Sequence, residues 1–175
     1  MRCRSLGWVQ APQAEANTQP CWGPKEADTI LAHAPIAYLA YFTFLRETGC
    51  RAGEGKFLTW TDIDLDRRVI LIRPKYGWKP KTGDQRKVPI TARLAELLGS
   101  VPQRGGGWVF TAPTTMRHPQ PDRQVSERRA RLALKRVLTR LNLDGHLHTL
   151  SPYVYQSSTN GWCSRGGCAR LGGAR

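Results

Sequence analysis

The chain has 175 residues, of which 40% are hydrophobic and 23% are charged, a composition typical of one globular domain and not of a disordered protein. Lysine and arginine total 27 against 13 acidic residues, giving a net charge of +14 that arises entirely from residues 51–175. Such a one-sided charge attracts polyanions such as nucleic acid, although a merely soluble basic protein would carry it too. The sequence shows no apolar run long enough to cross a bilayer and no signal peptide, which predicts a cytoplasmic protein.

The first half of the chain is predicted to be helical after an N-terminal linker or disordered tail. Residues 1–24 contain prolines and glycine without a sustained apolar period, which indicates the linker. Residues 25–34 place Ala27, Ile30, Leu31 and Ala34 on one helical face. An apolar helix follows and ends at Gly49, and residues 51–59 are predicted to form a short helix.

The second half is predicted to contain a small sheet and two further helices. Between residues 66 and 90, two runs rich in β-branched residues flank a turn-rich link, which predicts a hairpin. A helix over 91–100, a short strand over 108–110 and a long basic helix over 125–141 follow. The buried face of that last helix is predicted to comprise Leu132, Leu134, Val137, Leu138 and Leu141. The expected fold class is mainly α with a small antiparallel β-sheet.

Three motifs occur in a fixed order over residues 25–150, which we interpret as one partial catalytic domain. They are TGCRAGEGKFLTWTDIDL at 48–65, KTGDQRKVPI at 81–90 and GHLHTL at 145–150. Together they resemble the signature boxes of the tyrosine recombinase (phage integrase) family. The resemblance implies a helical catalytic domain that acts in site-specific DNA recombination and integration, with double-stranded DNA as its partner.

The resemblance also assigns roles to individual residues. Arg51 is expected to clamp the scissile phosphate at a helix start, Lys81 to act as general acid for the leaving 5′-oxygen, and His148 to assist proton transfer. Glu54 is expected to orient this site, and Trp60, Ile63 and Leu65 are interpreted as core. Taken singly, each functional residue would more simply be a surface or packing residue; the ordered combination favours the active site. The basic residues of the hairpin expected to contact DNA are Lys75, Lys79, Arg86 and Lys87.

No cofactor is implied, because the family neutralises the phosphate with its own basic residues instead of metal ions. The five cysteines are scattered and odd in number, which argues against a disulfide framework. His146, His148, Cys163 and Cys168 lack the paired spacing of a zinc site, so no metal is expected.

The third motif departs from the family pattern after Leu150. Ser151 occupies the position of a second phosphate-binding arginine, and Tyr153 and Tyr155 lie too close to His148 to be the nucleophile. Permitted codons for residues 151–175, read one nucleotide later, restore an Arg-His pair and a later Gly-His pair. We therefore hypothesise that 151–175 is a frameshifted, non-native tail and that the chain is an inactive remnant. The coding DNA past codon 150 tests this hypothesis, and codons that cannot encode those pairs in the shifted frame would contradict it.

Two other functions remain open at this point. A non-catalytic DNA-binding regulator would require sequence-selective binding, which phosphate contacts alone do not provide. A generic basic RNA-binding protein has only the charge in its favour, without a recognisable stacking motif. Missing C-terminal helices would also leave part of the apolar face of helix 125–141 uncovered, which predicts self-association.

Overall fold

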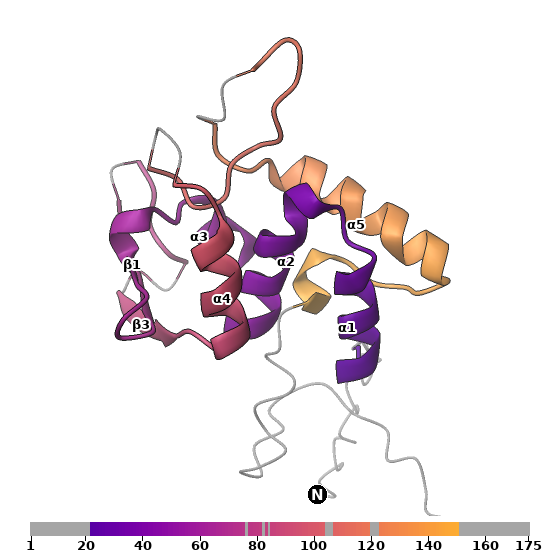
Figure 1. Ribbon diagram of the computed structural model, residues 1–175, viewed down its shortest axis with the longest axis horizontal. Helices are drawn as coiled ribbons and strands as arrows, with labels where there is room; N and C mark the ends of the chain where they lie inside the picture. The colour runs from indigo at the N-terminus through magenta and orange to yellow at the C-terminus, as the bar shows by residue number, and fades with distance from the viewer. Residues whose placement is uncertain are drawn as a thin grey trace, which may run out of the picture.

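The computed structural model describes residues 22–75, 77–81, 83, 85–103, 107–119 and 123–150 of the chain. The described part has five α-helices, two short 3-10 helices and three strands (Figure 1). In chain order they are α1 (Pro24–Ala32), α2 (Ile36–Thr48), α3 (Ala52–Lys56), η1 (Trp60–Asp62), β1 (Ile63–Asp64), β2 (Val69–Ile72), β3 (Arg86–Pro89), α4 (Ala92–Ser100), α5 (Glu127–Leu141) and η2 (Leu147–Leu150). The predicted mainly α class with a small antiparallel sheet is therefore confirmed.

The sheet is a three-stranded antiparallel meander in the order β1-β2-β3. Ile70 pairs with Ile63 on one side and with Val88 on the other. Ile70 and Ile72 are buried whereas the alternate residues of β2 are half-buried, as expected for a strand with one face on the core. The two predicted strands are confirmed, and β1 is an additional strand that the sequence interpretation did not include.

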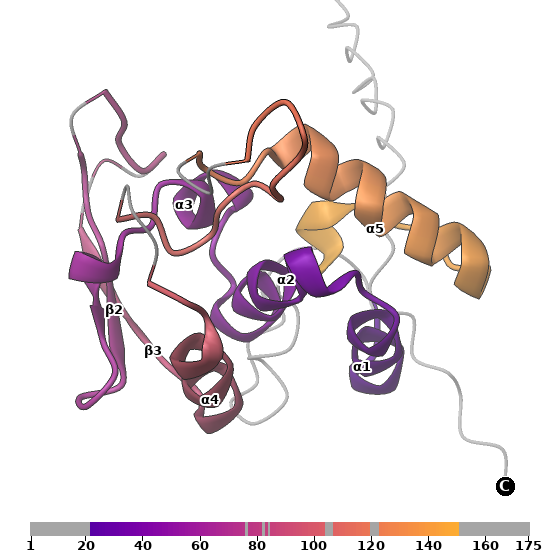
Figure 2. The same ribbon diagram turned by 45° about the horizontal axis from the view of Figure 1, so that its top comes forward.

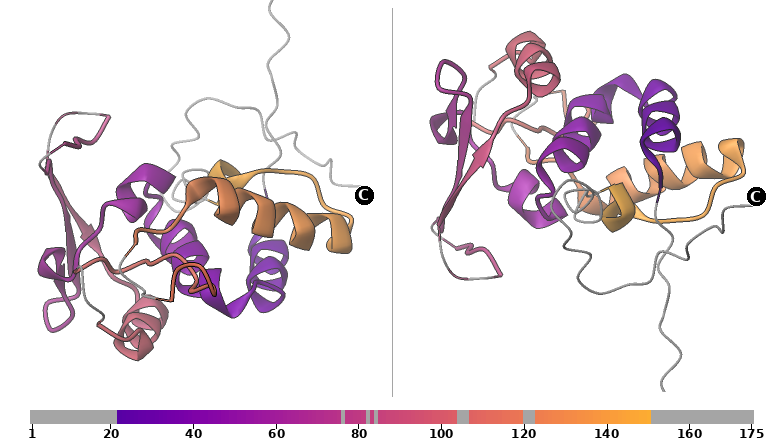
Figure 3. Two further views of the ribbon diagram at one scale, coloured as in Figure 1. Left: turned by 90° about the horizontal axis from the view of Figure 1, so that it is seen from above. Right: turned by 90° about the horizontal axis from the view of Figure 1, so that it is seen from below.

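Helix α2 is the centre of the packing. Its residues Phe42 and Phe44 are fully buried, and it lies between the sheet and α4 on one side and α1 and α5 on the other (Figures 2 and 3). The apolar residues of α1 and α2 recur at helical spacing, so each helix buries one stripe or more against its neighbours. The predicted helices over 25–34, 91–100 and 125–141 are confirmed by α1, α4 and α5.

Three details of the sequence interpretation were wrong. Leu132 is 50% exposed, because residues 130, 133, 134, 137 and 138 form the buried face of α5 and residue 132 points away from it. Residues 108–110 form only one isolated bridge, between Trp108 and Thr59, and no strand. Trp60, Ile63 and Leu65 pack against the core but are only partly buried.

The apolar face of α5 is covered within the described part of the chain. Ala130, Leu134, Val137 and Leu138 are each less than 5% exposed, and α5 packs against α1, α3 and η2. Because the apolar face of α5 is covered, it gives no basis for self-association. Self-association of the chain stays a prediction. None of the helices in the described residues is long and apolar enough to span a membrane.

Trp22 ties the start of the described chain to the loop that leads into η2. Its indole Nε1 donates a hydrogen bond to the backbone oxygen of Asp144 at 2.9 Å, and the ring packs directly on Gly145. Gly145 has a φ of +147°, and a Cβ there would lie 2.3 Å from Cζ2 of Trp22. Only glycine satisfies both conditions. Residues 1–21 lie outside the described residues, but Trp22, which the sequence placed in the N-terminal linker, packs with the domain.

We predict that Gly145→Ala destabilises the fold by about 2 kcal/mol, because the added methyl group meets the Trp22 ring and the backbone is strained. Denaturant unfolding monitored by circular dichroism measures this change. Gly99→Ala is the matched control, because a Cβ at Gly99 in α4 meets no atom within 4 Å. Equal destabilisation by the two variants, or no coupling between Gly145→Ala and Trp22→Ala, would contradict the steric explanation.

Candidate functional site

Arg51 lies at the start of α3, directly after the turn that ends α2 at Gly49. Its side chain is 50% exposed, so the guanidinium is available to a ligand. Helix α3 has five residues, and the N–H of Arg51 donates to Oε2 of Glu54 at 2.7 Å. The Glu54 carboxylate therefore caps the N-terminal end of α3. The sequence interpretation had expected a bound phosphate at this helix start.

Contacts with α2 fix the position of α3. The Tyr41 hydroxyl donates a hydrogen bond of 2.9 Å to the backbone oxygen of Ala52. A Cβ at Gly55 would lie 2.9 Å from ring carbons of both Tyr41 and Phe44, so a larger residue could not pack this closely. Burial raises the pKa of Tyr41 above its ordinary value, so its hydroxyl stays protonated and remains a donor. Arg51 is thus presented by a short helix seated on the central helix of the fold.

Glu54 is the electrostatic centre of the site. Its side chain is 2% exposed, and both of its oxygens accept from Arg86 of β3, Oε1 from Nη1 at 2.9 Å and Oε2 from Nη2 at 2.7 Å. Burial raises the pKa of Glu54, but the hydrogen bonds from Arg86 and Arg51 and the two guanidinium charges outweigh it. The net pKa is lowered, so Glu54 is ionised at neutral pH.

A second buried carboxylate, Asp62, binds two residues just past the end of β2, where the link to β3 begins. Asp62 accepts from Arg73 Nε at 2.8 Å and from Thr59 Oγ1 at 2.6 Å, and it also binds the Lys75 ammonium. Burial raises the pKa of Asp62, but the hydrogen bonds from Lys75 and Thr59 and the Lys75 charge lower it by more, so the net pKa is lowered. Lys75 also donates to the backbone oxygen of Phe57.

These pairs divide the four hairpin residues that were predicted to bind DNA. Lys75 and Arg86 are each bound by a buried carboxylate, so much of their charge is neutralised inside the fold. Lys79 and Lys87 are exposed. DNA contact by any of the four stays a prediction, and the structure favours the exposed pair.

His148 lies in η2, which packs against α2 and α5. Partial burial lowers the pKa of His148, and the nearby charges of His146, Arg131 and Arg51 lower it further, against an opposing effect of Glu127. The imidazole is therefore neutral at pH 7 and can exchange a proton. The packing of η2 against α2 and α5 thus sets His148 within electrostatic influence of Arg51 and of charged side chains on α5.

The structure thus brings Arg51, Glu54 and Arg86 into contact at the start of α3, and the charge of Arg51 contributes to the lowered pKa of His148. Lys81 is exposed in the turn of the hairpin, and no contact joins it to this group. Sequence reasoning missed Asp62 and the α5 pair of Glu127 and Arg131. The polar face of α5 was visible as a basic amphipathic pattern, whereas nothing in the sequence indicates which hairpin cation Asp62 binds.

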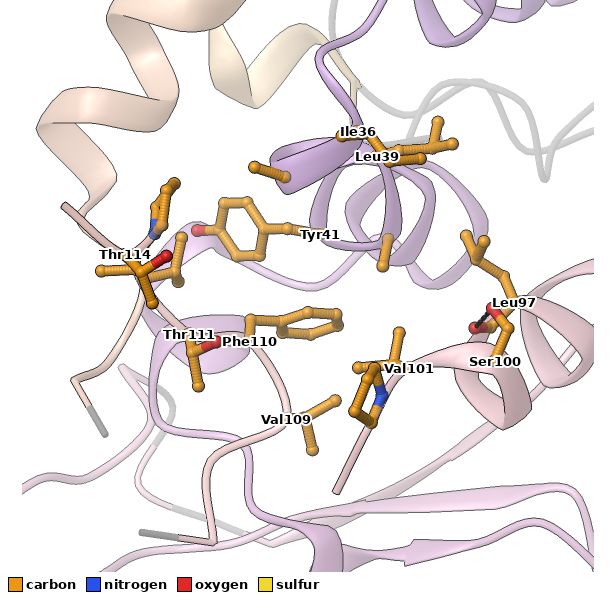
Figure 4. A pocket seen from close by; sticks show the side chains of 16 residues that line it. Ile36, Leu39, Tyr41, Leu97, Ser100, Val101, Val109, Phe110, Thr111 and Thr114 are labelled. Carbon is orange, nitrogen blue, oxygen red and sulfur yellow. Dashed lines mark hydrogen bonds between the residues drawn. The ribbon is translucent and has the colours of Figure 1, made fainter. Parts of the chain in front are cut away.

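A separate hollow of about 440 Å³ lies between α2, α4 and residues 109–114 (Figure 4). Leu39, Tyr41, Leu97 and Phe110 are among its lining residues, and no charged side chain lines it. None of the candidate site residues borders this hollow, so it cannot serve as the phosphate site.

A sequence model described as the phage integrase family matches residues 24–151. Three solved structures similar to the chain are XerA recombinase, Tn1549 transposon integrase in complex with a circular intermediate DNA, and a lambda integrase dimer bound to a COC′ core site. Their identities are 17%, 16% and 16%, with TM-scores of 0.62, 0.62 and 0.59. The matches cover 87%, 87% and 81% of this chain, and 54%, 56% and 41% of theirs, so the chain spans about half the length of these proteins. No curated protein matches the sequence significantly.

We predict that Glu54→Gln destabilises the fold by about 2 kcal/mol at pH 7, because it leaves the partly buried Arg86 guanidinium without its counter-charge. Denaturant unfolding at several pH values measures this loss. Because the pKa of Glu54 is lowered in the fold, its contribution is fully present above the ordinary carboxyl pKa and is lost as the pH falls through its folded value. The gap between the two proteins should therefore narrow in acid. Glu96→Gln, at an exposed position of α4, is the control; an equal loss there would refute the ion-pair explanation.

Proposed function

Because this chain belongs to the phage integrase family, we propose that it binds duplex DNA and holds the scissile phosphate of a recombination site through Arg51. The observation that supports this proposal most directly is a half-exposed arginine beside a buried, ionised glutamate that already has its own arginine. Arg86 makes the short hydrogen bonds to Glu54, whereas Arg51 Nη1 lies 3.8 Å from Glu54 Oε1 in a looser ion pair. The charge of the half-exposed Arg51 is therefore only partly neutralised within the fold. It remains to neutralise charge that grows on the non-bridging phosphate oxygens.

The other candidate residues add a hydrogen-bonding group and a proton donor around that phosphate. His148, neutral at pH 7, donates a hydrogen bond to a phosphate oxygen, and Lys81 lies in the motif that would supply the proton for the leaving 5′-oxygen if the strand were cut. Glu54 acts through Arg51 and Arg86 and does not touch DNA. The exposed face of α5 extends the positive surface beyond the site, since residues 128–140 include six basic side chains: Arg128, Arg129, Arg131, Lys135, Arg136 and Arg140.

Ser151 limits the chemistry that we propose for this chain. Residues 151–175 lie outside the described residues. A serine hydroxyl carries no positive charge, so it cannot help Arg51 to neutralise the phosphate. The transition state for strand cleavage therefore lacks part of its electrostatic stabilisation. We propose that the chain binds the phosphate without cutting the strand.

The proposal predicts salt-dependent binding of duplex DNA in which Arg51 contributes one phosphate contact. Fluorescence anisotropy with a labelled duplex over a series of salt concentrations gives the slope of log K against log[salt]. Arg51→Ala should reduce the magnitude of this slope by about 0.9. Arg93→Ala removes an equal charge from α4, where Arg93 pairs with Asp28, and should leave the slope unchanged.

Other results would favour the alternatives. An equal slope change for the two arginine variants would reduce the interaction to general charge attraction. Tighter binding of single-stranded RNA would favour an RNA-binding protein, and strong preference for one DNA sequence without cleavage would favour a regulator. A covalent complex with a nicked duplex would refute the absence of cleavage and leave the Arg51 proposal intact.

A further inference from the structure

The link between β2 and β3 is folded back onto the segment that follows α3. Lys75 and Trp78 exchange two backbone hydrogen bonds, of 2.8 and 2.9 Å, which hold these two residues together at a turn. Both residues then contact the same neighbour: the Trp78 ring stacks on Phe57 with a centroid distance of 4.9 Å and an interplanar angle of 13°, and Lys75 donates to the Phe57 backbone oxygen. The turn is therefore fastened at both of its ends.

Trp78 also reaches the first turn of α3. Its indole Nε1 lies 4.0 Å from the position that a Cβ would take at Gly53, two residues after Arg51. Phe57 ends the same short helix, since its N–H donates to the backbone oxygen of Gly53 at 3.2 Å. The Trp78 side chain thus lies along α3 from its first turn to Phe57, the residue that caps its C-terminal end.

Lys81 follows Trp78 by three residues, so its Cα lies within about 10 Å of the Trp78 Cα whatever the turn geometry. Pro80 between them is buried, which further restricts the path. Without the stack of Trp78 on Phe57, the link between β2 and β3 could move, and Lys81 could occupy many positions relative to Arg51.

We propose that Trp78 is a positioning residue that holds Lys81 on the Arg51 side of the molecule by stacking on Phe57. This inference rests on the proposed phosphate-binding function. It implies that the hairpin is held in one orientation and does not move freely. The stack of Trp78 on Phe57 is an aromatic contact that favours one orientation of the hairpin several-fold. Lys75 and its partner Asp62 support the same orientation from the other end of the turn.

A double-mutant cycle on DNA affinity tests the inference with the unmodified chain as reference. Trp78→Ala removes no charge, yet it should reduce the salt slope of duplex binding by about 0.9, as Lys81→Ala does. The two changes should not add, since a misplaced Lys81 has already lost its phosphate contact. Trp78→Phe, which retains a ring to stack on Phe57, should keep the original slope.

The matched cycle combines Trp78→Ala with Lys87→Ala, a charge removed from β3 outside the fastened turn, and these changes should add. If Trp78→Ala does not fold by circular dichroism, Trp78→Leu fills the space without a planar ring and replaces it in both cycles. Additivity of Trp78→Ala with Lys81→Ala, or an unchanged slope in Trp78→Ala, overturns the inference. Duplex binding that is insensitive to Lys81→Ala also overturns it, whereas absence of salt-dependent duplex binding by the unmodified chain overturns the proposed function itself.

Discussion

The ion pair between Glu54 and Arg86 is the interaction on which the candidate site depends. A carboxylate that is 2% exposed is costly to bury unless its lone pairs are satisfied, and here two guanidinium N–H groups and the Arg51 backbone N–H satisfy them. Because one partner comes from α3 and the other from β3, the pair fixes the distance between the sheet and the start of α3, where Arg51 lies. The half-exposed Arg51 side chain, whose Nη1 lies 3.8 Å from Glu54 Oε1, is the cation of this group that the carboxylate engages least.

Asp62 repeats this arrangement at the other strand of the hairpin. It binds Arg73 and Lys75 just beyond the end of β2, while Glu54 binds Arg86 at the start of β3. The two long strands are therefore attached at the same end to buried carboxylates that belong to the segment 54–62. Three of the basic residues that contribute to the positive charge of residues 51–175, namely Arg73, Lys75 and Arg86, are paired in this way. The positive surface that can attract DNA is carried by the residues that remain, above all the outer face of α5.

The sequence was sufficient to predict most of the fold, because helices and strands were specified by local patterns. Alternation in 69–72 and apolar spacing in 130–138 follow from the geometry of one strand and one helix. Leu132 was wrongly predicted to be buried because it is apolar, although its angular position on α5 lies off the face formed by residues 130, 134 and 137. The isolated bridge at Trp108 was mistaken for a strand because an aromatic, β-branched run has the same appearance in both.

The site was only partly predictable, and the reason is physical. Arg51, Glu54, Lys81 and His148 could be proposed because their motifs are local, but the partner of Glu54 lies 32 residues away and that of Asp62 lies 13 away. Lysines and arginines that follow one another in the hairpin are chemically equivalent in the sequence. Which of them faces a buried carboxylate and which faces solvent is decided by strand register and by the stack of Trp78 on Phe57, which are properties of the folded chain.

The same contacts separate the binding of a phosphate from its cleavage. The groups that hold Arg51 in place, namely the Tyr41 hydroxyl through α3, the Glu54 carboxylate and the Arg86 guanidinium, come from α2, α3 and β3. None of these contacts involves residue 151. If Arg51 binds the phosphate as proposed, a serine at the position of the family's second arginine would remove a positive charge from the phosphate without removing any of these contacts, so affinity for the DNA backbone and catalysis need not be lost together. Catalysis depends on charge stabilised only in the transition state, and that is where the missing arginine would act.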